Sequence, residues 1–287
     1  MWKAGDLVLR SSYGKDICFV IVEVDLERGE ATLKGLDVRL MADAPLHDLA
    51  MVSETVYKSY QAAQSKLEHD TLRLVQLRRQ VERDKLDYRS ERKRQPHDFF
   101  ERPGRVLHLD GDGSYLEKCL IFYRRLGIRA VGKNIPELEM PDVIPELLEE
   151  YEPDILIITG HDGVLRRGKA NEVMQLANYR NSDHFIRAVR AARKHERSLD
   201  ELIIFAGACQ SHYEALLEAG ANFASSPQRI LIHALDPVFV AEKIAFTPIN
   251  ETIDIFQVVH STITGTDGLG GVESRGKYRI GLPRSRY

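Results

Sequence analysis

A cysteine and a histidine each follow a short apolar run that ends in small residues. The run 203–206 leads through Gly and Ala to Cys209, and the run 154–158 leads through Thr and Gly to His161. Buried runs of this length are typical of strands inside a parallel sheet, and the carboxyl ends of such strands share one edge. The pattern therefore predicts that Cys209 and His161 lie together as a nucleophile and its general base.

The chemistry expected of this pair is acyl transfer through a thioester. A thiol attacks a carbonyl only as thiolate, and a neighbouring imidazole and a helix N-terminus both favour that form. His161 would take the thiol proton and later protonate the leaving amine, while the amides of Cys209 and Gly163 would bind the oxyanion. His161 stands 48 residues before Cys209, near the roughly 50-residue separation in caspases, although the residues flanking the cysteine differ from the caspase motif.

The elements that must position this pair follow Pro103, where apolar strand patterns begin to alternate with helical ones. The expected fold class is α/β, a parallel sheet flanked by helices of the caspase-like or flavodoxin-like kind. Strands are predicted at 105–109, 128–131, 154–158, 202–206 and 229–233, and helices at 114–126, 141–151, 182–194 and 211–219. The acidic Gly-rich turn 110–113 is expected to cap a helix, and residues 265–287 are expected to form a hairpin or a tail.

Two further parts precede this region. Residues 6–52 alternate apolar with polar residues between glycines, which predicts a small antiparallel barrel. Residues 53–93 contain no Gly or Pro and carry a near-heptad pattern, which predicts a long helix and a homo-oligomer through it. The heptad positions are Val56, Tyr60, Ala63, Leu67, Asp70, Leu74, Leu77 and Val81. The predicted parts are thus a barrel at 1–52, a helix and basic linker at 53–102, and a peptidase domain at 103–287.

Composition limits the classes of partner. The 287 residues include 40 Lys plus Arg and 43 Asp plus Glu, so the net charge of -3 gives no reason to expect nucleic acid. Three cysteines without paired spacing argue against a disulfide framework and a structural zinc site, and we expect neither a metal nor another cofactor. No signal peptide or membrane-spanning run is evident, which predicts an intracellular protein without a membrane partner.

The chain resembles the YabG family, the sporulation-specific cysteine peptidases of endospore-forming bacteria. The resemblance is densest in the segments 108–112, 158–163, 205–211, 221–227, 232–237 and 262–266. It implies an endopeptidase of the mother-cell cytoplasm that can associate with the spore coat. It further implies cleavage of spore-coat and cortex-associated proteins after Arg, self-processing, and catalysis by His161 and Cys209.

An Arg preference calls for a buried carboxylate that can accept two hydrogen bonds from a guanidinium. Asp236 is the first candidate and Asp162 the second, ahead of the acidic stretch 134–154; a helix N-cap before Pro237 is an equally good interpretation of Asp236. Self-cleavage is predicted in the basic linker 89–105, where an exposed chain offers several Arg sites.

Two other functions fit the same residues. The Gly-x-Cys-x-Ser pattern at Cys209 also resembles the nucleophile turn of glutamine amidotransferase-like hydrolases, in which His233 or His260 would be the base. The second is a coat-assembly adaptor without catalysis, whose Cys209 would titrate near 8.5 or above.

Overall fold

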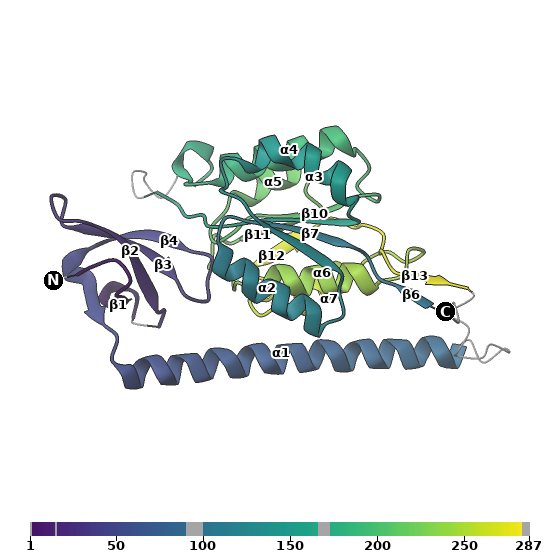
Figure 1. Cartoon of the computed structure of the whole chain (residues 1–287), viewed down its shortest axis with the longest axis horizontal. Coiled ribbons are helices and arrows are strands. Elements are labelled where there is room, and N and C mark those ends of the chain that lie inside the picture. Colours follow the sequence, from purple (N-terminus) through teal and green to yellow (C-terminus); the bar gives the residue numbers. More distant parts are fainter. Residues whose placement is uncertain (1, 15, 90–99, 166–172, 283–287) are drawn as a thin grey trace.

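The computed structural model describes residues 2–14, 16–89, 100–165 and 173–282. An antiparallel sheet, a long helix and an α/β domain follow one another along the chain (Figure 1). The first sheet has the strand order β4-β3-β2-β1-β5. Its strands are β1 (Leu7–Arg10), β2 (Phe19–Asp25), β3 (Glu30–Gly35), β4 (Met41–Pro45) and β5 (Leu49–Met51), with short 3-10 helices at Ser11–Tyr13 and Leu46–Asp48. Its alternating apolar residues, among them Val8 and Leu33, form the core expected of a small β-domain.

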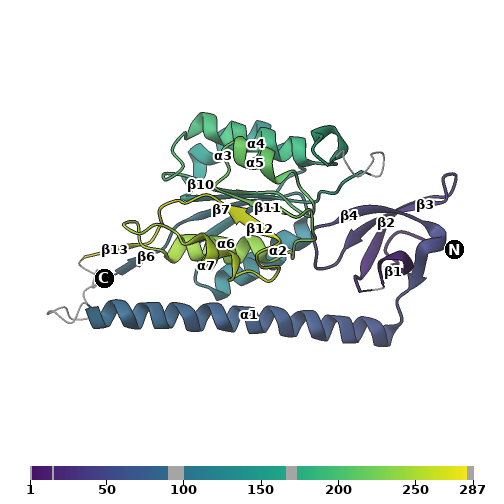
Figure 2. The same cartoon turned by 180° about the vertical axis from the view of Figure 1, so that it is seen from behind.

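Helix α1 spans Glu54–Arg89 and contains 36 residues, so it is about 54 Å long. It runs along the side of the α/β domain that carries α2, α6 and α7, as both views show (Figures 1 and 2). Leu72 and Val75 are its buried contacts with that domain. The predicted heptad positions do not make this contact, since Leu74 is 62% exposed and Leu77 50% exposed. Closer to its C-terminus, the helix is held by an ion pair between Arg79 and Glu242, whose atoms are 2.6 Å apart.

The α/β domain is built on a six-stranded sheet of order β12-β11-β10-β9-β7-β8. The parallel strands are β7 (Val106–Asp110), β8 (Ala130–Asn134), β9 (Ile155–Thr159), β10 (Ile203–Ala206) and β11 (Phe223–Ser225), and β12 (Leu269–Gly271) is antiparallel. Strands β7, β9 and β10 are buried at every position, which explains their continuous apolar runs. The predicted α/β class is confirmed.

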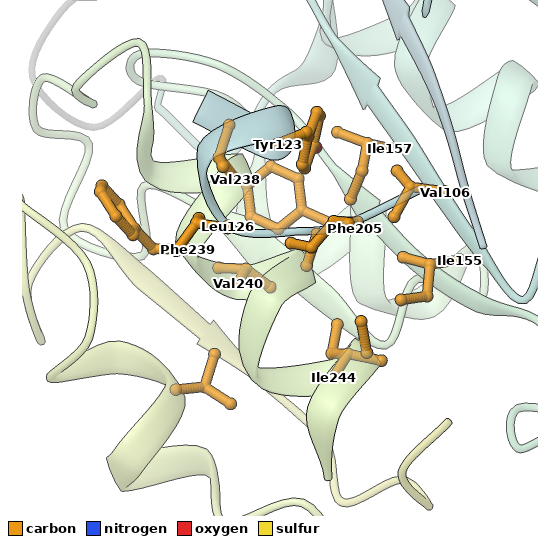
Figure 3. Packing of buried hydrophobic residues seen from close by; sticks show 14 of the residues in the cluster. Val106, Tyr123, Leu126, Ile155, Ile157, Phe205, Val238, Phe239, Val240 and Ile244 are labelled. Carbon is orange, nitrogen blue, oxygen red and sulfur yellow. The ribbon is translucent and has the colours of Figure 1, made fainter. Parts of the chain in front are cut away.

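Helices cover both faces of this sheet (Figures 1 and 2). The helices are α2 (Gly113–Arg125), α3 (Met140–Tyr151), α4 (Ser182–His195), α5 (Tyr213–Glu218), α6 (Asp236–Phe246) and α7 (Ile255–Val259), with a 3-10 helix at Leu176–Asn178. Figure 3 shows Phe205 and Ile157 of the sheet packed with Phe239 and Ile244 of α6. The core on the opposite face includes Leu156 and Ile204.

The structure differs from the sequence prediction in one segment next to Cys209. The apolar run 229–233 is not a strand, and within it only His233 forms an isolated antiparallel bridge, to Val38. The reason is that this run pairs with the connection between β3 and β4, where the Arg39 amide donates to the Ile232 carbonyl at 2.9 Å.

Two terminal segments close the fold. Short strand β6 (Phe100–Arg102) pairs with β13 (Arg279–Gly281), so the predicted tail contributes both β12 and β13. Most of the predicted self-cleavage linker 89–105 lies outside the described residues. Among the described helices, none is long and apolar enough to cross a membrane.

Candidate active site

The carboxyl ends of β7, β9 and β10 meet at one edge of the sheet. Ala206 is in register with Ile158, and Cys209 and His161 each lie three residues beyond that pair. Strand β7 ends there too, with Asp110 opposite Thr159. Three neighbouring strands therefore deliver a thiol, an imidazole and a carboxylate to the same edge, as parallel topology requires.

The turn after β10 is shaped by Gly207. Its φ of +113° is unfavourable for residues with a side chain, and a Cβ there would collide with Ser225 Oγ. The Ser211 side chain accepts a hydrogen bond from the Ala208 amide at 2.9 Å and so tightens the turn. Helix α5 begins only at Tyr213 and has six residues, so the predicted helix N-terminus lies farther from Cys209 than expected from the sequence.

Cys209 is fully buried. Its Sγ accepts a hydrogen bond from the Ile232 amide at 3.0 Å and lies 3.6 Å from the Ile232 carbonyl oxygen. Burial raises the pKa of the thiol to about 12, and the Ile232 amide offsets only part of that effect. In this arrangement the thiol is neutral and shielded.

His161 lies between two carboxylates. Its Nε2 is 3.3 Å from Asp112 Oδ2, and its Nδ1 is 3.8 Å from Glu137 Oε1. The Nε2 contact is an ion pair without the alignment of a hydrogen bond. The His161 amide also donates to Glu137 at 2.8 Å. Burial opposes the charged imidazolium, but the two carboxylates outweigh it and raise the pKa of His161.

The structure brings His161 and Cys209 to one edge, but no hydrogen bond joins the two side chains among the described residues. The Tyr115 ring lies beside His161, with the two ring centroids 5.4 Å apart. Asp112, which caps α2 through the Ser114 and Tyr115 amides as predicted, thus also holds the imidazole.

The two predicted oxyanion donors have different partners. The Cys209 amide points at a carbonyl oxygen, that of Arg39, at 3.3 Å. The Gly163 amide instead donates to its neighbour Asp162 at 2.9 Å. Only the Cys209 amide has the direction expected of an oxyanion donor.

The carboxylates predicted to bind a substrate Arg are occupied by the protein's own donors. Asp162 accepts from Gly163, Asn181, Ser182 and Ser211, and Asp236 accepts from His233, Ile263 and Thr264. Both are fully buried, and burial raises the pKa of Asp236 to about 6 despite those donors. Asp236 is not a helix N-cap, since Leu235 holds that position. Both predicted carboxylates are therefore already satisfied by internal donors.

Asp110 is a buried carboxylate that binds a guanidinium of the chain itself, that of Arg39, and the sequence analysis did not single it out. Its Oδ2 is 2.7 Å from Nη1 of Arg39, and both side chains are fully buried. Burial opposes ionisation, but the Arg39 charge and hydrogen bonds from His108 and the Asp112 amide hold the pKa of Asp110 at about 2. The signal that could have identified Asp110 from the sequence was its position as an acidic residue at the end of a buried strand, in the same sheet as the strands that carry His161 and Cys209.

A cleft of about 1080 Å³ adjoins the site between the N-terminal sheet and the α/β domain. Gly163 and Gln210 line it from the α/β side, and Leu40 and Met41 line it from the other. The lining of the cleft thus includes Gln210, the residue that follows Cys209 in the chain.

One cluster has the composition of a metal site. Ligand atoms of Asp37, Glu68 and His233 lie within 4.8 Å of one another. The ammonium of Lys118 is 2.7 Å from Asp37 and also contacts Glu68, so both carboxylates already pair with a cationic side chain.

The two alternative bases differ in position. The His233 ring accepts the Leu235 amide at Nδ1, lies 3.6 Å from Glu68 through Nε2, and has a pKa lowered to about 3 by burial and by the charge of Lys118. His260 is exposed at the end of α7. Neither arrangement offers an imidazole aimed at the thiol.

Comparison with known proteins decides the family. The sequence matches the YabG peptidase U57 family over residues 3–283. The chain belongs to this peptidase family. It is 43% identical over 287 residues to the sporulation-specific protease YabG of Bacillus subtilis (strain 168), with 98% of each chain covered. The resemblance drawn from the sequence segments is thereby confirmed, and the strand-end residues described above belong to a peptidase.

Proposed function

We propose that the chain is a cysteine endopeptidase in which Cys209 is the nucleophile and His161 the general base. The observation that carries the proposal is their matched position beyond the register pair of β9 and β10. The Cys209 amide donates to a backbone carbonyl, and this direction supports the proposal that the amide binds the oxyanion.

The chemistry follows from these positions. His161 takes the thiol proton, and the thiolate attacks the substrate carbonyl while the Cys209 amide binds the oxyanion. The charges of Asp112 and Glu137 stabilise the imidazolium that results, which offsets part of the cost of ionising a buried thiol. The imidazolium then protonates the leaving amine, and water hydrolyses the thioester to release the new carboxylate and restore the thiol.

The biological setting is proposed from the family. The Bacillus subtilis relative is described as sporulation-specific, so we infer a role in sporulation, with spore-coat and cortex-associated proteins as substrates in the mother-cell cytoplasm or at the coat. Cleavage after Arg and self-processing belong to the same proposal.

Helix α1 supports a homo-oligomer. One of its faces packs on the α/β domain through Leu72 and Val75, while the heptad positions Leu67, Leu74 and Leu77 remain exposed. An apolar heptad stripe of this kind is buried when a second copy pairs with it.

A peptide that contains one Arg, and whose fluorescence is quenched until the peptide is cleaved, tests the catalytic proposal. Cys209→Ala and His161→Ala should each reduce kcat/KM by about 10³-fold or more, whereas Cys18→Ala should keep wild-type activity because Cys18 is buried just before β2 and is not one of the strand-end residues of the α/β domain. Equal cleavage by all four proteins would exclude a Cys209/His161 mechanism. Activity lost in His233→Ala but retained in His161→Ala would favour the amidotransferase-like alternative.

A further inference from the structure

The connection between β3 and β4 passes the candidate active site, pairs with residues 232–234, and turns at Arg39, where the Leu40 amide donates to the Val38 carbonyl at 2.8 Å. The Arg39 amide donates to the Ile232 carbonyl at 2.9 Å, and the Ala234 amide donates to the Asp37 carbonyl at 2.8 Å. Between these bonds, Val38 forms an antiparallel bridge with His233. Paired backbone hydrogen bonds on alternate residues are how sheet edges and clefts commonly hold extended peptides.

The Arg39 side chain fills a closed pocket beside the thiol. Its Nη1 binds Asp110 at 2.7 Å and its Nη2 donates to the Ala234 carbonyl at 2.9 Å. The guanidinium lies 5.2 Å from the centre of the Tyr115 ring. A carboxylate, a carbonyl and an aromatic face are groups that recognise arginine, although Nε of Arg39 has no hydrogen-bond partner among the described residues.

The Arg39 carbonyl contacts the backbone of the proposed nucleophile. Its oxygen accepts the Cys209 amide at 3.3 Å, which is the contact required of an oxyanion donor. Beyond it, Leu40 and Met41 form part of the wall of the cleft that Gly163 and Gln210 also line. The chain therefore passes from the Arg39–Asp110 pair, past the Cys209 amide, to the wall of the cleft.

The other buried arginine of the N-terminal sheet provides a contrast. Arg10 is also shielded from solvent, but its carboxylate partner, Asp48, belongs to the same sheet and lies 2.9 Å away. Arg39 instead reaches a strand end of the α/β domain. An arginine that only stabilised the N-terminal sheet would need no carboxylate partner at the strand ends of the α/β domain.

We propose that residues 37–40 occupy the enzyme's own substrate site, that Arg39–Leu40 is a self-cleavage bond, and that Asp110 is the carboxylate that selects arginine. This inference rests on the proposed cysteine peptidase function. Cys209 Sγ bonds to the Arg39 carbonyl carbon, the bond from that carbon to the Leu40 nitrogen breaks, and the proton from the thiol passes through His161 to the new Leu40 amine. Water then hydrolyses the thioester, which leaves a carboxylate on Arg39 and returns the proton to the thiol.

Denaturing intact-mass analysis of the full chain tests the cleavage. Denaturation is needed because β3 pairs with β4 across the cut and would keep the fragments together. Wild type should release the fragment 1–39 with a first-order rate that is independent of protein concentration. Arg39→Gln should not release it, and neither should Cys209→Ala. Arg28→Gln is the matched control, since Arg28 is exposed in the turn before β3, and it should cleave at the wild-type rate.

Asp110→Asn tests the specificity role. Because Asp110 also binds His108 and the Asp112 amide, the readout is a ratio that a structural role would leave unchanged. That ratio compares kcat/KM for an arginine peptide with kcat/KM for the same peptide carrying neutral citrulline. It should fall on the order of 10²-fold. An unchanged ratio would overturn the assignment of Asp110.

The outcomes separate this inference from the proposed function. If Arg39→Gln cleaves the arginine peptide through Cys209 while the Arg39–Leu40 bond of wild type stays intact, self-cleavage at this bond is wrong and the peptidase proposal stands. A cleavage rate that rises with protein concentration would refute the intramolecular site. If neither wild type nor Arg39→Gln cleaves the peptide, the peptidase proposal itself fails.

Discussion

Asp110→Asn should open the site and expose Cys209 to alkylation. Arg39 and Asp110 are both fully buried and 2.7 Å apart. Removing one charge from such a pair leaves the other uncompensated, at a cost of about 3–5 kcal/mol. If this cost falls on the closed arrangement, the open population rises by about 10² to 10³-fold or more.

The thiol responds to the same change. In the closed arrangement, burial raises the pKa of Cys209 from 9.0 to about 12, so its thiolate is about 10³-fold scarcer than at an unperturbed thiol. When labelling proceeds through opening, the rate follows the open population, and Asp110→Asn should accelerate it on the order of 10²-fold. The site cannot be labelled efficiently while residues 37–40 cover it.

The assay is iodoacetamide labelling at pH 8, read by peptide mass spectrometry. His161→Ala is the parent, because it keeps Cys209 and prevents cleavage during the measurement. Asp43→Asn is the matched control, since Asp43 pairs with Arg180 across the same interface at 2.8 Å but remains accessible to solvent. An exposed pair contributes about 0–1 kcal/mol, so labelling should change by less than about fivefold.

Cys18 is the internal reference. It is buried just before β2, so faster labelling of Cys209 with unchanged Cys18 indicates local opening, and equal acceleration of both indicates unfolding. Cys209 labelling at the same rate in Asp110→Asn and its parent would refute the view that Arg39 and Asp110 close the site.

Three further predictions concern the base, the long helix and assembly. The pKa of His161 is raised above 6.5 although burial opposes it, because Asp112 and Glu137 favour the imidazolium. That stabilisation is complete below about pH 6.5 and disappears as the pH rises through the raised pKa. In urea unfolding of the Cys209→Ala protein, Glu137→Gln should therefore lower the free energy of unfolding by about 1–2 kcal/mol at pH 6 and by less at pH 9. An equal loss at both pH values would exclude a charged His161. Leu72→Ala should cost about 2–4 kcal/mol because Leu72 is 6% exposed, whereas Leu74→Ala should cost less than about 0.5 kcal/mol; similar losses would contradict the packing of α1. Leu74→Lys with Leu77→Lys should reduce the molar mass measured by light scattering to that of a monomer, and a wild type that is already monomeric would contradict the oligomer.

The strand ends that carry the candidate pair could be predicted from the sequence. Strands β9 and β10 are buried on both faces, so each must be an uninterrupted apolar run, and such runs are visible without a structure. Parallel topology then requires that residues following the runs share an edge, which is why Cys209 and His161 could be selected together. The α/β class follows from the same local periodicity.

The pocket was decided only by tertiary structure. Arg39 and Asp110 are 71 residues apart, and nothing in the local pattern of either residue indicates its partner. Asp236 and Asp162 were the first and second candidates from the sequence, because a sequence does not reveal which carboxylates are already satisfied by internal amides and hydroxyls.

The same limit explains the strand that was predicted wrongly. The run 229–233 has the composition of a strand, but its backbone pairs with the β3–β4 connection instead of the sheet. The heptad pattern of α1 predicted the helix, but not that Leu72 and Val75 would pack on the α/β domain, because that surface is remote in sequence. Local periodicity determines which elements form, while long-range pairing of backbone, charge and apolar surface decides what covers the thiol.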